Sequence, residues 1–187
     1  MKKSITCFVC LMLVLCLSGC ISPQWRTLHT TLREQGTQTK SAENGTYSLT
    51  LSPGEKNTVV ATYEYKTSAA LQQSSLTMIL TFDQSDTAHF SAKSEMKVSI
   101  LGKEITTKET FEGTLKKSEF STESELTVAS YQREQTDVKG TTTSTNAEAA
   151  STGTLKVAVE RSVPLLKEIL EDICPEIAPK ALGFTKI

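Results

Sequence analysis

The side chains with the clearest capacity for chemistry in this chain are its cysteines, and four of the five lie within the first twenty residues. These four are Cys7, Cys10, Cys16 and Cys20, and Cys174 stands alone near the other end. Thiolates at short spacing can bind Zn²⁺ or form disulfides. Whether these cysteines bind metal or form disulfides depends on the fate of the N-terminal segment, because a segment removed after synthesis contributes nothing to the mature protein.

That segment has the composition of a secretory signal peptide. Two lysines are followed by an uncharged apolar run at residues 5–17, which is shorter than the roughly 20 residues that a membrane-spanning helix needs. Small residues then lead to Cys20. We therefore expect residues 1–19 to be removed, so that the three cysteines inside them act only as small apolar side chains of the signal.

The sequence Leu17-Ser18-Gly19-Cys20 resembles the lipobox of bacterial lipoproteins. The resemblance implies that a peptidase cuts before Cys20 and that the Cys20 thiol carries acyl chains such as palmitate. Two or more acyl chains hold a protein stably on a membrane, whereas one gives only marginal binding. An ordinary cleaved signal or an uncleaved short anchor is the alternative.

The lipoprotein interpretation predicts that the protein is located in the cell envelope, with the domain tethered to a membrane and facing the periplasm or the exterior. Ile21 and Ser22 differ from the aspartate that marks inner-membrane retention in Gram-negative lipoproteins, which favours the outer membrane in such a host. Without residues 1–19 the chain keeps 18 basic and 21 acidic side chains, a net charge of −3. This charge gives no indication of a nucleic-acid partner.

Between residues 46 and 159 the hydrophobic pattern has a period of two, which is typical of strands. Turn signals such as Pro53-Gly54 separate the runs. Seven strands are expected, at residues 47–51, 59–65, 76–82, 88–100, 105–115, 120–128 and 155–159. The fold class is therefore mainly β, an antiparallel meander sheet that is curved or forms a half-open barrel, with a flat sandwich as the alternative.

Helical patterns flank the strands. Ser22 and Pro23 suit the start of a short helix whose apolar residues are Trp25, Leu28 and Leu32. We expect this helix to dock on the sheet, and the alternative places Trp25 at the level of the lipid headgroups. Residues 34–44 are expected to form a linker.

A second, amphipathic helix is predicted to begin after Ser162 and to stop at Pro175, followed by a tail that packs back on the domain. Residues 137–154 are predicted to form a long mobile loop. The domain organisation is thus a signal at 1–19, a lipidated segment with a helix and linker at 20–45, and an antiparallel β domain with a C-terminal helix at 46–187. Cys174 lies on the apolar side of that helix, so we expect it to be buried.

No catalytic or metal-binding motif accompanies this pattern. His29 and His89 have no ligand-type neighbours at metal-binding spacing, and no cofactor is predicted. We do not expect an enzyme; the enzyme alternative requires His89, a carboxylate and a hydroxyl to meet in one cleft.

The expected function is the binding of a lipid or another apolar ligand in the concavity between sheet and C-terminal helix. This outline is similar to periplasmic carriers of lipoproteins and lipids, which also place helices inside a half-open barrel, although no motif is shared. The alternative is a structural or interaction lipoprotein that engages another envelope protein or a host molecule, and the sequence identifies no such protein partner. The residues expected to line the pocket are Phe90, Met96, Val98, Phe111, Leu166 and Leu170.

Overall fold

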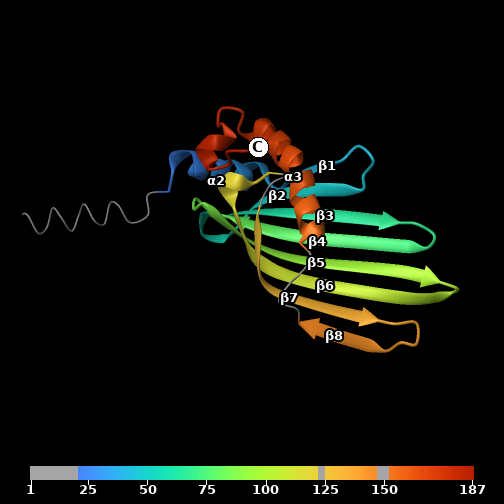
Figure 1. The fold of residues 1–187 in the computed structure, drawn as a ribbon. Helices are drawn as coiled ribbons and strands as arrows, with labels where there is room; N and C mark the ends of the chain where they lie inside the picture. The colour runs from blue at the N-terminus through green and yellow to red at the C-terminus, as the bar shows by residue number, and fades with distance from the viewer. Residues whose placement is uncertain (1–20, 122–124, 147–151) are drawn as a thin grey trace, which may run out of the picture.

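The computed structural model describes residues 21–121, 125–146 and 152–187, so the predicted signal segment and Cys20, the predicted lipidation site, lie outside the described residues. Eight strands form one antiparallel meander sheet in chain order, with β1 and β8 at its two edges (Figure 1). The predicted fold class is confirmed. The strands are β1 (Gln38–Ser41), β2 (Tyr47–Pro53), β3 (Val59–Ser68), β4 (Gln72–Phe82), β5 (Thr87–Ile100), β6 (Lys103–Lys116), β7 (Leu126–Thr136) and β8 (Thr142–Asn146).

The N-terminal helix α2 (Pro23–Gln35) forms as the sequence predicts. The Ser22 hydroxyl accepts a hydrogen bond from the Trp25 backbone N–H at 3.1 Å, which caps the helix. Trp25, Leu28 and Leu32 are each 2% exposed or less, and the indole Nε1 donates to the Asn57 carbonyl at 2.7 Å. The helix therefore docks on the domain, and the alternative with Trp25 at the headgroups is wrong.

The C-terminal helix α3 (Gly153–Ile173) is longer than predicted. Residues 155–159 form its first turns, so the strand predicted there is wrong. Leu155, Ala158 and Val159 are buried at helical spacing, a pattern that a short run of alternating residues can mimic. The helix passes through Pro164, and the Ser162 hydroxyl donates to the Ala158 carbonyl at 2.7 Å just before it.

Both edge strands lie in segments that the sequence pattern assigns to irregular structure. The predicted linker at 34–44 contains β1, and the predicted loop at 137–154 contains β8. Edge strands can be short and polar because they have no second neighbour to pair with, so they lack the apolar alternation that reveals inner strands. Strand β7 also continues to Thr136 after a register shift opposite Glu112 and Gly113, beyond the predicted end at residue 128.

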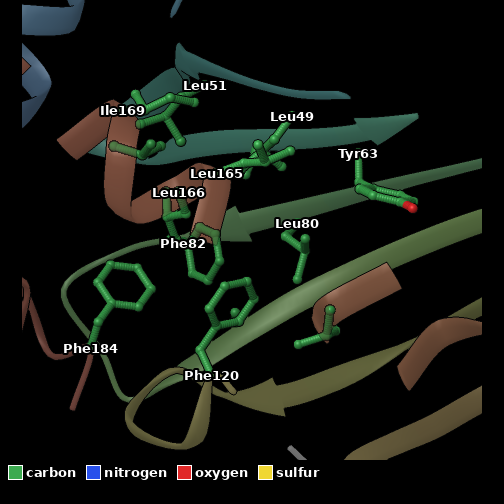
Figure 2. Packing of buried hydrophobic residues seen from close by; sticks show 14 of the residues in the cluster. Leu49, Leu51, Tyr63, Leu80, Phe82, Phe120, Leu165, Leu166, Ile169 and Phe184 are labelled. Atoms are coloured by element: carbon green, nitrogen blue, oxygen red, sulfur yellow. The ribbon is translucent and has the colours of Figure 1, made fainter. Parts of the chain in front are cut away.

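The core lies between α2, α3, the C-terminal tail and one face of the sheet, which we call the inner face (Figure 2). Phe82, Phe120 and Phe184 bring three segments together, with ring centroids 5.2–5.9 Å apart in edge-to-face contacts. The tail thus packs back on the domain as expected. Cys174 is 1% exposed, as predicted, and burial raises the pKa of its thiol.

Candidate functional site

Helix α3 covers only part of the inner face, and strands β3–β6 continue past it toward the right of Figure 1. Strand β5 shows the change along its length. Phe90 and Ala92 are buried, whereas Met96 and Ile100 on the same face are 39% and 49% exposed. The apolar alternation of β5 therefore extends beyond the buried part of the strand.

The uncovered apolar residues form a continuous line that we call the open stripe. Val98 of β5 pairs with Ile105 of β6, and both are half-buried and lie outside the buried core cluster. The stripe runs from beside the core to the end of the β5–β6 hairpin. Its members are Met96, Val98, Ile100 and Ile105.

The structure separates the six residues predicted to line one pocket. Phe90, Phe111, Leu166 and Leu170 are 1–4% exposed and belong to the packed core. Met96 and Val98 belong to the open stripe. The sequence places all six on apolar faces, but it does not reveal where the helix stops covering the strands.

A polar cluster marks the end of the stripe nearest the core. The Glu109 carboxylate accepts hydrogen bonds from the Ser94 hydroxyl at 3.1 Å and from the Tyr131 hydroxyl at 2.7 Å. Burial raises the pKa of Tyr131, and the bond to Glu109 raises it further. Ser94 is the next residue after Ala92 on the inner face of β5. The inner face therefore changes at this point from buried apolar side chains to half-buried polar ones.

A cation lies beside the covered half of the inner face. The Arg161 guanidinium of α3 stands 5.2 Å from the ring centre of Tyr47 and 5.3 Å from that of Tyr65. Burial raises the pKa of the neighbouring Tyr63, although the charge of Arg161 partly offsets this effect. The aromatic rings hold the guanidinium by cation–π attraction and leave it a permanent positive charge.

The outer face of the sheet carries the residues that the enzyme alternative requires. A hollow of 490 Å³ there is lined by His89, Glu112, Ser91 and Ile79, among others. No hydrogen bond joins His89 to Glu112 in the described residues, and those residues contain no cluster of three potential metal ligands. His29 instead lies buried in α2, where its Nε2 is 3.2 Å from the Gly54 carbonyl oxygen.

Lys117 is an unexpected member of the core, at 2% exposure. Its ammonium donates to the Asp83 carbonyl at 2.6 Å and lies 4.5 Å from the centre of the Trp25 ring. Burial lowers the pKa of Lys117, an effect that Asp83 and Asp86 partly offset. Lys116 and Lys117 are adjacent lysines, and no local sequence signal distinguishes the buried one from the exposed one.

The lowered pKa of Lys117 predicts a pH-dependent contribution to stability. Unfolded Lys117 titrates near 10.5 and the folded residue at lower pH. Between these two pH values the unfolded chain binds the extra proton, so this residue's contribution becomes more favourable as pH rises through the window. Below the folded pKa both states are protonated and the penalty of burying the charge is constant.

Urea unfolding of the wild type and of Lys117→Met at several pH values between 7 and 10 measures this contribution, because methionine keeps the apolar stem without the charge. We expect the difference in unfolding free energy to shift in favour of the wild type as pH rises. Lys116→Met, whose native side chain is 62% exposed, is the control and should show no such trend. A pH-independent difference for Lys117→Met would contradict the prediction.

No helix in the described part of the chain is long and apolar enough to cross a membrane. In comparisons with protein-family models, curated proteins and solved structures, nothing matches this chain.

Proposed function

We propose that this protein is a lipid-anchored protein of the cell envelope that binds an acyl chain or a similar apolar ligand along the open stripe, without catalysing a reaction. The observation that carries the proposal is the continuation of the apolar inner face past α3, where Met96 and Ile100 remain 39% and 49% exposed. Water contact with a line of aliphatic side chains is unfavourable, and a bound apolar ligand would relieve it.

The shape of the stripe favours a linear ligand. Met96 and Ile100 are about 13 Å apart along an extended strand, and the stripe occupies two adjacent strands. A stable protein interface usually buries about 800 Å² on each partner, which is more than such a narrow line of side chains offers. An extended hydrocarbon chain matches both its length and its width.

The groups near the stripe favour a ligand with a polar head that carries both a hydrogen-bond donor for Glu109 and an anionic group for Arg161. Arg161 supplies a permanent cation on the inner side of the sheet, and the cluster of Ser94, Glu109 and Tyr131 lies where the stripe meets the core. An acyl chain in the stripe would direct its head toward this end, where Arg161 attracts a carboxylate or phosphate and the Glu109 carboxylate accepts a hydrogen bond from a hydroxyl or protonated acid. A fatty acid or phospholipid is therefore the proposed ligand class.

The membrane tether is proposed from the lipobox and supported by the start of the folded domain. The Ser22 backbone N–H donates to Gln84 Oε1 at 3.0 Å, so the chain is fixed to the domain two residues after Cys20. Acylation of Cys20 would therefore hold this end of the domain close to the bilayer, in the outer membrane of a Gram-negative host.

The proposal predicts that Met96→Asn weakens fatty-acid binding about tenfold, which corresponds to about 1.4 kcal/mol. Palmitate below its aggregation concentration can be titrated by calorimetry into the chain from residue 21, which contains every described element. Ile79→Asn is a matched control because Ile79 is also 39% exposed but lies on the outer face. We expect the control to bind like the wild type.

Absence of palmitate binding, or an equal loss in both variants, would count against the open stripe. Native mass spectrometry of the purified protein provides a second readout and should reveal co-purified lipid. Crosslinking in intact cells that recovers one defined protein, together with no lipid binding, would favour the interaction lipoprotein instead. The exposed edge strand β8, which carries no charged side chain, would then be the candidate for pairing with a partner strand.

A further inference from the structure

The β3–β4, β5–β6 and β7–β8 turns lie at the same end of the sheet (Figure 1), and each of these turns carries an exposed aliphatic side chain. Leu71 in the β3–β4 turn is 69% exposed, Leu101 in the β5–β6 turn is 99% exposed, and Val138 in the β7–β8 turn is 38% exposed. The Ser99 backbone N–H donates to the Leu71 carbonyl at 2.9 Å and ties the first two turns together. We call Leu71, Leu101 and Val138 the apolar tip.

The conformation of Leu101 is unfavourable for a leucine. Leu101 has φ +51° and Gly102 has φ +77°, so the two-residue turn needs positive φ at both positions, where Asn-Gly is the preferred pair. A leucine at positive φ is strained, and this side chain gains no burial within the described structure in return. A contact outside the chain would give a physical reason for an apolar residue at this position.

The apolar tip lies far from the N-terminal segment. Ser22 contacts Gln84, which belongs to the turn just before β5, and Leu101 directly follows β5 at its other end. A strand of 14 residues spans about 43 Å. An anchor at Cys20 and the apolar tip would therefore lie at opposite ends of the sheet.

We infer that the apolar tip inserts into a lipid bilayer. Its three side chains project from separate turns, and a bilayer can receive such side chains without a complementary surface, whereas a stable protein partner requires a larger matched area. Lys103 and Lys139 lie at the turns and make no ion pair within the described residues, so they suit anionic headgroups. Of the carboxylates at the same turns, Glu104 lies 3.9 Å from the Lys97 ammonium and Asp137 accepts hydrogen bonds from backbone N–H groups of its own turn.

Insertion of the apolar tip into a bilayer would also provide a source for the ligand of the open stripe. This point rests on the proposed function. The open stripe ends at Ile100, directly beside Leu101. A lipid that leaves a bilayer at the tip would meet the stripe without crossing open water.

Flotation with vesicles of equal parts phosphatidylcholine and phosphatidylglycerol tests the inference on the chain from residue 21, which lacks the acyl anchor. We expect the wild type to bind and the double variant Leu71→Asn/Leu101→Asn to bind at least tenfold more weakly. Val157→Asn is the control, because Val157 is 41% exposed on α3, away from the tip. We expect this control to float like the wild type.

A loss of vesicle binding in the double variant can be distinguished from a failure of that variant to fold. Asparagine is favoured over leucine at positive φ, so Leu101→Asn should unfold at the same or higher urea concentration than the wild type while its binding falls. Equal flotation of the wild type and the double variant, or no flotation of the wild type, would overturn the inference. A photo-crosslinker at position 101 that captures a defined protein and no lipid in cells would also overturn it.

Failure of the inference is distinguishable from failure of the proposed function. The double variant keeps the entire open stripe, so its affinity for palmitate added from solution should equal that of the wild type. Loss of vesicle binding with unchanged palmitate affinity supports the tip as a separate site. Loss of both affinities would mean that tip and stripe are one site, and it would overturn the inference.

Discussion

Replacement of Trp25 by alanine is expected to lower the free energy of unfolding by about 3–5 kcal/mol, the usual cost of removing a large buried aromatic side chain. Trp25 is 2% exposed, its Nε1 donates to the Asn57 carbonyl at 2.7 Å, and the Lys117 ammonium lies 4.5 Å from the centre of its ring. The variant therefore opens a cavity, leaves a carbonyl without its donor and removes the cation–π partner of a buried charge.

Urea unfolding followed by circular dichroism measures this effect, because Trp25 is the only tryptophan and its fluorescence disappears with the substitution. Arg26→Ala, at the exposed neighbouring position of the same helix, should change the unfolding free energy by less than about 0.5 kcal/mol. A loss below about 1 kcal/mol in Trp25→Ala would show that α2 contributes little to the core.

Gly113→Ala should destabilise the domain by about 3 kcal/mol, at the upper end of the usual cost of overpacking. An added Cβ would lie 2.1 Å from the Thr127 carbonyl oxygen and 2.8 Å from Cζ of the Phe90 ring. The first of these contacts involves backbone, so the collision can be relieved only by moving β6 away from β7. Gly113 stands at the register shift between these two strands, where only a residue without a side chain allows their close approach.

Thermal unfolding monitored by circular dichroism measures this prediction. Glu112→Ala is the control, because Glu112 is the exposed neighbour on the same strand and its removal leaves the close approach intact. We expect the control to melt within about 2 °C of the wild type. A Gly113→Ala protein that melts like the wild type would mean that the β6–β7 pairing is looser than these distances require.

Several features of the fold could be predicted because their signals are local. Ser22 and Pro23 mark the start of α2 and the spacing of Trp25, Leu28 and Leu32 marks its buried side. The long alternation after Ala88 marks β5, which indeed has 14 residues. In each case the hydrogen bonds or the face that is formed depend on residues close in sequence.

The errors occurred where a local pattern fits two structures. Leu155, Val157 and Val159 alternate like a strand, but Leu155, Ala158 and Val159 also have helical spacing, and packing on the sheet selected the helix. The polar segments 38–41 and 142–146 became strands because an edge needs only a neighbour with free backbone groups. Neither outcome can be read from side-chain periodicity.

The sequence by itself determined which side chains share the inner face, because alternation along a strand is a property of backbone geometry. Only the tertiary structure decided which of them are buried. Phe90 and Met96 occupy the same face of β5, yet Phe90 is 4% exposed within the core and Met96 is 39% exposed. Lys116 and Lys117 are adjacent and chemically identical, yet the approach of Trp25 and Phe184 buries only Lys117. Burial depends on how far segments distant in sequence extend over one another, and that distance is fixed only when the whole core packs.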